Sequence, residues 1–263
     1  MWSLGLIVGV ALACAAAPLI APYEFDAIDL SSIRQPPSPQ HLMGTDDLGR
    51  DVFSRVLYGG RVSMLVGLLA AVVGTGLGTA VGAFAGFYGG RIDNLLMRMT
   101  DVAYSIPVLP LLIVLSSYVQ GAAWSMAIVI GLLSWMATAR VVRGDVLTIR
   151  QMSYVEAARG LGATNRRIIA RHVLPNALGP IVVAATLGVG NAIILESSLS
   201  FLGLGVQPPT PTWGNLLQDA QARMASEPWL AVFPGAAILL VVLAVNFVGD
   251  GLRDALDPAG RPT

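Results

Sequence analysis

The feature that most constrains this chain is a series of six mainly apolar stretches, each long enough or nearly long enough to cross a lipid bilayer. A membrane-spanning helix needs about 20 such residues. Of the 263 residues, 55% are hydrophobic and only 12% are charged, whereas soluble proteins carry about one quarter charged residues. We therefore expect an all-α polytopic membrane protein with six transmembrane helices, near residues 4–22, 62–88, 102–119, 122–139, 178–200 and 230–249.

The second stretch carries Gly74, Gly78 and Gly82 at intervals of four residues, so the three glycines share one helix face. A stripe of small residues lets two helices approach each other closely in a membrane. The sequence leaves open whether the partner helix belongs to the same chain or to another subunit.

The distribution of arginine predicts the orientation in the membrane. All 16 basic residues are arginines, and the larger share lies on cytoplasmic segments if the amino terminus is cytoplasmic. Cytoplasmic loops are enriched in basic residues. We therefore expect both termini, and the polar segment 140–177, on the cytoplasmic side.

The sequence predicts one membrane domain with an amino-terminal extension. We expect an amino-terminal transmembrane helix and an external amphipathic segment over residues 1–60, a transmembrane domain over residues 61–250, and a cytoplasmic tail over residues 251–263. Within the extension, Leu48, Val52 and Val56 form an apolar stripe at helical spacing. The stripe predicts a short helix that either lies on the outer membrane surface or packs on its own bundle.

The residue types available exclude several kinds of chemistry. A P-loop uses a lysine to reach the β and γ phosphates, and a Schiff-base enzyme uses a lysine amine, but this chain has no lysine. The one cysteine, Cys14, cannot form an internal disulfide, and the two histidines lie far apart in the sequence. We expect no catalytic residue, no metal site and no cofactor in this chain.

Residues 154–175, YVEAARGLGATNRRIIARHVLP, form a polar, arginine-rich segment between apolar runs. The pattern predicts two short helical patches that meet at a bend near Gly162 and end at Pro175. Glu156 favours the first turn of a helix electrostatically, and a side chain at Gly162 would obstruct the bend. The segment is suited to binding another protein, and the alternative is an ordinary loop whose arginines only fix the topology.

The spacing of Glu156, Ala157 and Ala158, then Gly162, then Leu174 and Pro175 resembles the EAA loop of ABC importer permeases. Four further segments are similar to the C-type permease subunit of dipeptide, oligopeptide and nickel ABC importers. They are HLMGTDDLGRDVFSRVLYGGR from His41, RHVLPN from Arg171, LSFLGLGVQPPTPTWG from Leu199, and NFVGDGLRDALDP from Asn246.

The resemblance implies a type I ABC importer permease fold and a subunit that is not itself an enzyme. It would move di- or oligopeptides across the bacterial plasma membrane by alternating access. Its partners would be a second homologous permease, two ATPase subunits or one two-domain ATPase holding ATP and Mg, an external substrate-binding protein and the lipid bilayer, with no nucleic acid. The residues that would couple it to the ATPase are Glu156, Ala157, Ala158, Arg159, Gly162, Arg166, Arg167, Leu174 and Pro175.

Two alternatives stay open. Nickel or a glutathione-like compound is the alternative cargo within the same family. The alternative from another class is an uncoupled channel or a secondary transporter, which would use charged residues inside the membrane. The expected spans contain almost no ionisable residues, which weighs against that class.

Glu196 is the main exception, because it lies inside the fifth expected span. A carboxylate inside a membrane is costly and usually faces a cavity or a partner. We expect Glu196 either to contact the ammonium group of a peptide, or a cation, on the translocation path, or to hold the turn formed by residues 197–205.

Overall fold

The computed structural model describes residues 2–119 and 121–256, and all regular secondary structure in these residues is helical. The all-α class expected from the sequence is thus confirmed. Three helices are long and apolar enough to cross a membrane alone. They are α3 (Val52–Tyr88), α10 (Leu178–Phe201) and α12 (Trp229–Leu256).

Two pairs of bent helices each satisfy the same criterion together, giving up to five candidate spans. Helix α4 (Gly90–Ser105) meets α5 (Val108–Ser116) at 78°, and α6 (Ala123–Leu132) meets α7 (Trp135–Ile149) at 47°. The helix expected over residues 102–119 is therefore broken, and its pair begins earlier, at Gly90. The helix expected over residues 122–139 is also broken, and its pair continues to Ile149. The first break falls at Pro107, because proline cannot continue a helix.

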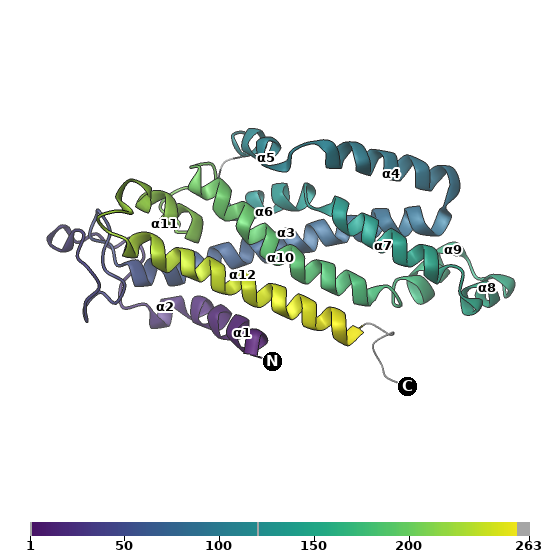
Figure 1. The fold of residues 1–263 in the computed structure, drawn as a ribbon, viewed down its shortest axis with the longest axis horizontal. Helices are drawn as coiled ribbons and strands as arrows, with labels where there is room; N and C mark the ends of the chain where they lie inside the picture. Colours follow the sequence, from purple (N-terminus) through teal and green to yellow (C-terminus); the bar gives the residue numbers. More distant parts are fainter. Residues whose placement is uncertain (1, 120, 257–263) are drawn as a thin grey trace.

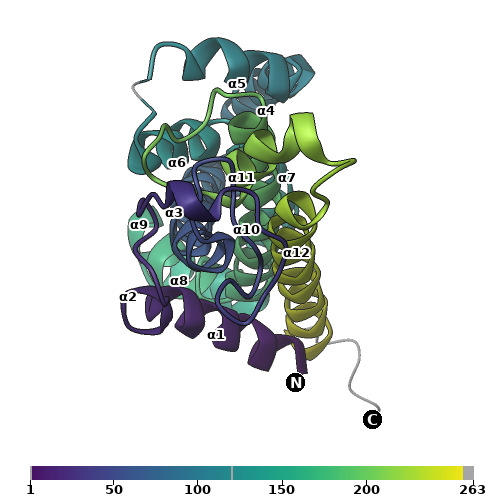
Figure 2. The same ribbon diagram turned by 90° about the vertical axis from the view of Figure 1, so that its left-hand side faces the viewer.

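The amino terminus forms two helices, α1 (Trp2–Ala15) and the short α2 (Ala17–Ile20). The sequence predicted a single helix near residues 4–22. Helix α1 has 14 residues and is too short to meet the length criterion for a span. It lies along α3 and α12, on the side of the bundle opposite α4 and α5 (Figures 1 and 2).

The expected amphipathic segment is not a separate surface helix. Asp51 caps α3 by accepting a 2.8 Å hydrogen bond from the backbone N–H of Ser54, and the helix then runs for 37 residues, about 55 Å. Val52 and Val56 are buried in the core beside Trp213. The second alternative, packing on the chain's own bundle, is the one observed, and the boundary expected at residue 60 falls inside α3.

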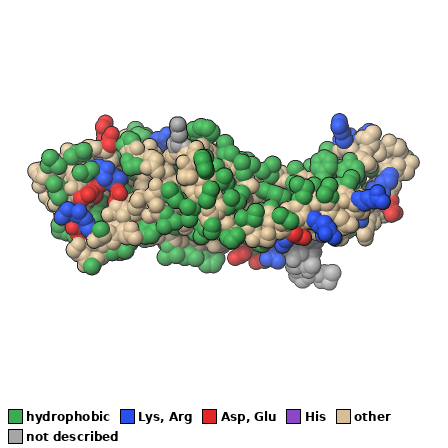
Figure 3. Space-filling view, turned by 90° about the horizontal axis from the view of Figure 1, so that it is seen from above, with side chains coloured by type: hydrophobic (Ala, Val, Ile, Leu, Met, Phe, Trp, Pro, Cys, Tyr) green, Lys and Arg blue, Asp and Glu red, His purple; other side chains and the backbone are tan. Residues whose placement is uncertain are grey.

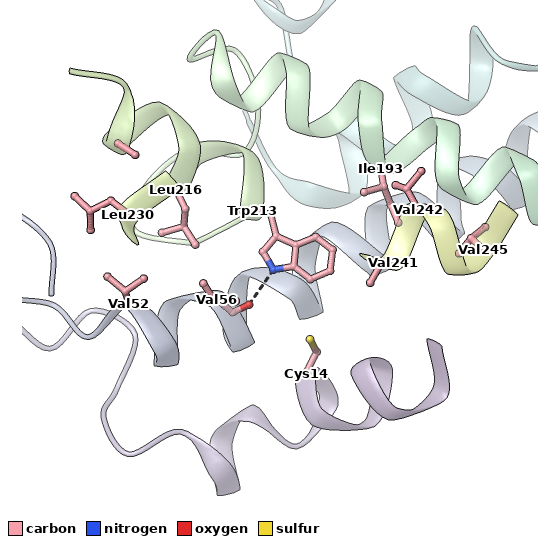
Figure 4. Packing of buried hydrophobic residues seen from close by; sticks show 11 residues of the cluster. Cys14, Val52, Val56, Ile193, Trp213, Leu216, Leu230, Val241, Val242 and Val245 are labelled. Carbon is pink, nitrogen blue, oxygen red and sulfur yellow. Dashed lines mark hydrogen bonds between the residues drawn. The ribbon is translucent and has the colours of Figure 1, made fainter. Parts of the chain in front are cut away.

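Trp213 joins three helices near the start of α3. It begins α11 (Trp213–Ala220), and its indole Nε1 donates a 3.0 Å hydrogen bond to the carbonyl of Val56 (Figure 4). A Cβ at Gly60 would lie 2.5 Å from Cys14 Sγ and 2.6 Å from Trp213 Cζ2. The missing side chain of Gly60 therefore lets α1 and α11 pack on the same point of α3.

The glycine stripe packs α3 against α6 and α7 of the same chain. A Cβ at Gly78 would lie 2.6 Å from both the carbonyl oxygen of Trp135 and Cβ of Thr138, and one at Gly74 would lie 3.2 Å from the carbonyl of Gly131. Backbone meets backbone here, which only glycine permits. The partner helices of the glycine stripe therefore belong to the same chain, which was one of the two alternatives that the sequence left open.

The bundle is elongated, with α8 and α9 at one end and α11 with the long loop before α3 at the other (Figures 1 and 2). Charged side chains gather toward the two ends, and hydrophobic side chains cover much of the middle (Figure 3). Helix α12 continues to Leu256, and residues 257–263 of the expected tail lie outside the described residues.

We expect Gly78→Ala to lower the free energy of unfolding by about 1 to 3 kcal/mol, because the added methyl group overpacks the contact between α3 and α7. The matched control is Gly76→Ala, since Gly76 is exposed on the same helix and no atom lies within 4 Å of its Cβ position. Thermal unfolding in detergent measures both variants. Equal melting temperatures would contradict the close contact.

Candidate functional site

The polar segment after α7 folds into short helices at one end of the bundle. Helix α8 (Ser153–Gly160) is followed by α9 (Asn165–Ile168), which continues as a π-helical segment, η2 (Ile169–Val173). The two helical patches expected from the sequence are present. The regular pattern ends at Val173, two residues before Pro175.

Gly162 ends α8 in a Schellman motif. The N–H of Gly162 donates to the carbonyl of Arg159 and the N–H of Ala163 donates to the carbonyl of Ala158, both at 3.0 Å. The φ angle of Gly162 is +78°, and no atom lies within 4 Å of its Cβ position. Glycine is therefore favoured by the left-handed backbone, so a side chain would hinder this bend, as expected, through backbone strain and not through crowding.

Helix α8 and its neighbours rest on the ends of α3 and α7. Val155, Ile168 and Val173 are fully buried, and they form one apolar cluster with Phe87 of α3 and Ile149 of α7. Because these side chains share one buried cluster, α8 packs on the ends of α3 and α7.

Two arginines strengthen this end of the bundle. Arg150 donates a 2.8 Å hydrogen bond from Nη1 to the carbonyl of Gly86, in the last turn of α3, where a cation is favourable. Arg143 of α7 binds Asp93 of α4 through two hydrogen bonds of 2.5 and 2.6 Å. In the sequence these arginines were evidence only for topology, and in the structure they also join helices.

The nine expected coupling residues lie together on the α8 end, and most face outward. Ala158 and Leu174 are half-buried against the apolar cluster, so of the two alanines only Ala157 is fully available to a partner. The exposed members are Glu156, Ala157, Arg159, Gly162, Arg166, Arg167 and Pro175.

Sequence reasoning missed the apolar side chains on the same surface. Leu161 is 89% exposed, and Met152 and Tyr154 are also exposed. Apolar groups gathered on a polar surface are a feature of protein interaction sites. The sequence carries this signal only in part, since the same segment also contains apolar residues that are buried, such as Val155 and Ile168. We define the coupling surface as the exposed residues of the preceding paragraph together with Met152, Tyr154 and Leu161.

Glu196 lies far from the coupling surface and is fully buried in α10. Its carboxylate accepts hydrogen bonds from Ser63 Oγ of α3 at 3.0 Å and from Ser200 Oγ at 2.7 Å. Ser63 Oγ in turn accepts a 3.2 Å hydrogen bond from the backbone N–H of Trp213. This network links α3, α10 and α11, and this geometry favours the structural alternative for Glu196 over contact with a substrate.

A second polar network lies at the end of the molecule opposite the coupling surface. Arg55 binds Asp46 at 2.5 Å and Asp219 at 3.4 Å, and Arg50 binds Asp46 at 2.7 Å. Burial raises the pKa of the Asp219 carboxyl, and the nearby Arg55 and Arg50 partly offset this rise. The network ties the loop before α3 to α11. Among the described residues, no group of His, Cys, Asp and Glu side chains could hold a metal ion.

Comparisons with known proteins agree with this architecture. The sequence profile of the family described as "Binding-protein-dependent transport system inner membrane component" matches residues 78–261. A protein of Brucella suis that is named as a peptide permease is 45% identical over 243 residues, which cover 92% of this chain and 80% of the relative. The glutathione transport system permease protein GsiD of Escherichia coli is 45% identical over 240 residues, covering 91% and 79%.

A solved structure shares the fold. It is an inward-facing conformation of the MetNI methionine ABC transporter, in which one chain matches with a TM-score of 0.63 at 18% sequence identity. The match covers 77% of this chain and 96% of the other. At this level of identity, the similarity concerns the arrangement of helices.

We expect Gly162→Ala to destabilise the end of α8 by about 1 to 2 kcal/mol, because alanine is disfavoured in the left-handed conformation. Gly160→Ala is the matched control, since Gly160 has a negative φ angle and open space at its Cβ position. Hydrogen exchange of the α8 amides should become faster only in Gly162→Ala. Equal exchange rates in the two variants would contradict the role of the Schellman motif.

For Glu196, we expect replacement by alanine to cost about 2 to 4 kcal/mol of stability, because several buried hydroxyls lose their acceptor and a cavity remains. Glu196→Gln should cost much less, since an amide keeps an oxygen acceptor in the same place. Melting temperatures in detergent measure the difference, and equal losses would argue against a hydrogen-bonding role.

Proposed function

Because this chain belongs to the family of binding-protein-dependent transport system inner membrane components, we propose that it is the permease subunit of an ATP-driven ABC importer in the bacterial plasma membrane. The subunit provides a path through the membrane, and the ATPase is a separate protein. The observation that carries the proposal is the coupling surface, an exposed helix fixed to two long membrane helices by a buried apolar cluster.

Peptides are the proposed cargo, on the basis of the relative named as a peptide permease. A glutathione-like substrate is the second candidate, because GsiD is equally similar over nearly the same length. Both are peptide-like molecules with free charged groups. Nickel, the remaining alternative from the sequence, has no support among these relatives.

The coupling surface suits a partner with an apolar groove and an acidic rim. Leu161 and Tyr154 supply apolar contact, and the exposed Arg166 and Arg167 supply positive charge. The chain has no lysine for a P-loop, so ATP and Mg would be held by the partner ATPase subunits. When ATP draws these subunits together, they would push α8 and bias the bundle toward one of two arrangements, which is a coupling free energy between sites.

The proposed topology has six transmembrane helices with both termini in the cytoplasm. The three long helices and the two bent pairs provide five of them, and α1 extended by α2 would provide the sixth. The coupling surface would then face the cytoplasm, where the arginines around it agree with the enrichment of basic residues in cytoplasmic loops.

A second permease would pack against exposed apolar residues of α4 and α5. Leu95, Val102, Leu109 and Val114 on these helices are exposed apolar residues. Helices α4 and α5 lie on one side of the bundle in both views (Figures 1 and 2). An external binding protein would deliver the substrate to the end of the molecule opposite the coupling surface. At that end, α11 and the loop before α3 form the outer surface.

The experiment that tests the proposal is native mass spectrometry of the complex recovered from mild-detergent membranes through a tag on this chain. We expect one copy of this chain with a second permease and two ATPase copies. Recovery of the chain alone, or as a homo-oligomer without an ATPase, would instead support an uncoupled channel or secondary transporter.

Glu156→Lys tests the coupling surface within the same complex. The reversed charge at the first turn of α8 should leave folding intact, because Glu156 is exposed, and should lower transport per ATP hydrolysed or weaken ATPase recovery. Glu24→Lys is the matched control, since it makes the same change at an exposed site on the opposite side of the membrane in the proposed topology. Unchanged transport and ATPase recovery in Glu156→Lys would contradict the proposed role.

A further inference from the structure

An ion pair between α4 and α7 is exposed on the surface of the chain. Arg140 Nη2 of α7 lies 2.7 Å from Asp101 Oδ1 of α4, and the side chains are 46% and 62% exposed. The guanidinium carbon of Arg140 also lies 4.6 Å from the ring centroid of Tyr104, which is close enough for a cation–π interaction. Among the described residues, both charged side chains are thus only partly covered.

We place the pair within the membrane, because Asp101 and Arg140 belong to bent helix pairs that meet the criterion for a span, although the sequence assigned residue 140 to a cytoplasmic segment. Ala139, which precedes Arg140, contacts the α3 backbone at Gly78 and Gly82, and α3 has no charged residue between positions 62 and 88. Arg140 is nine residues before the end of α7, or about 14 Å from it along the helix axis. Asp101 is eleven residues from the start of α4, or about 16 Å.

An exposed charge pair at this depth does not face lipid, because charged groups inside a membrane face a bundle interior, a partner or a water-filled cavity. The α7 surface beside Arg140 is also open. Ala137 and Gly144 lie three residues before and four residues after Arg140 on the same helix face, and both are exposed. No atom lies within 4 Å of the Cβ position of Gly144.

The neighbouring ion pair, Arg143 with Asp93, is less exposed than the pair of Arg140 with Asp101. Arg143 and Asp93 share two hydrogen bonds, and the Asp93 side chain is only 11% exposed. That pair is enclosed and serves to join α4 to α7. Asp101 exposes a carboxylate that accepts hydrogen bonds, and Arg140 exposes guanidinium N–H groups that donate them. Each side chain can therefore release the other and bind a ligand group instead.

We propose that Asp101 and Arg140 form a binding station on the translocation path for the charged ends of a peptide-like substrate. Asp101 receives an ammonium group, and the guanidinium of Arg140 receives a carboxylate through paired N–H donors. Tyr104 holds the guanidinium in place. The station rests on the proposed importer function, and it gives that function a site for a zwitterionic substrate within the membrane.

Cysteine accessibility tests whether the station faces water. In the full complex with a Cys14→Ala background, Ala137→Cys and Gly144→Cys should react with a membrane-impermeant sulfonate thiol reagent added from the cytoplasmic side. Both variants leave the ion pair intact. Met99→Cys is the control, because Met99 is exposed but lies two residues, or about 200° around α4, from Asp101.

The expected result is reaction at positions 137 and 144 several-fold faster than at position 99. If positions 137 and 144 react as slowly as position 99, the pair is covered by lipid or by the second permease, and the proposal is overturned. ATPase stimulation by the loaded binding protein, measured on the same samples, tests the importer function independently of the labelling.

Charge removal tests the class of ligand. With saturating loaded binding protein, Arg140→Gln should reduce transport of a peptide with a free carboxylate about fivefold more than transport of its carboxamide, each relative to the parent complex. Arg91→Gln, an exposed arginine at the start of α4, should reduce neither. Equal losses for the two substrates in Arg140→Gln would reduce the pair to a structural link and overturn the proposal.

Discussion

The close contact of α3 with α6 and α7 is the interaction on which the rest of the structure depends. Gly74, Gly78 and Gly82 bring backbone against backbone along this contact. With α3 fixed in this way, its carboxy-terminal end provides Phe87 to the cluster beneath α8, and its amino-terminal half provides Ser63 to the network of Glu196. Both ends of the molecule are therefore positioned by one helix, which spans 37 residues.

The polar groups of the bundle are concentrated where helices begin, end or meet. Asp51 caps the start of α3, Arg150 binds carbonyl groups at its end, and Glu196 joins its amino-terminal half to α10 and α11. A buried polar group costs free energy unless it is hydrogen-bonded, so each of these groups favours one arrangement of helices. Apolar packing alone leaves more freedom, since lipid is as apolar as the helix surfaces.

The sequence predicted the helical class and the two helical patches before Pro175, because both depend on local patterns of apolar residues and on proline and glycine. It failed where burial or pairing changes the meaning of a residue. The stripe of Val52 and Val56 left a surface helix and packing on the bundle both open, because the packing of α11 on α3 that decides between them is a long-range contact. The pairing of Asp101 with Arg140 has no signal in the sequence, because the two residues lie 39 positions apart.

In the proposed importer, movement at α8 would reach α4 and α5 through α7. Helix α8 shares one buried apolar cluster with α7, and α7 is joined to α4 by the Asp93–Arg143 and Asp101–Arg140 ion pairs. Helix α4 has few buried side chains, so these ion pairs make up much of its attachment to α7. In the proposed importer, a shift of α7 would therefore act on α4 through the same charged groups that we propose bind the substrate, so one set of residues would serve both force transmission and substrate contact.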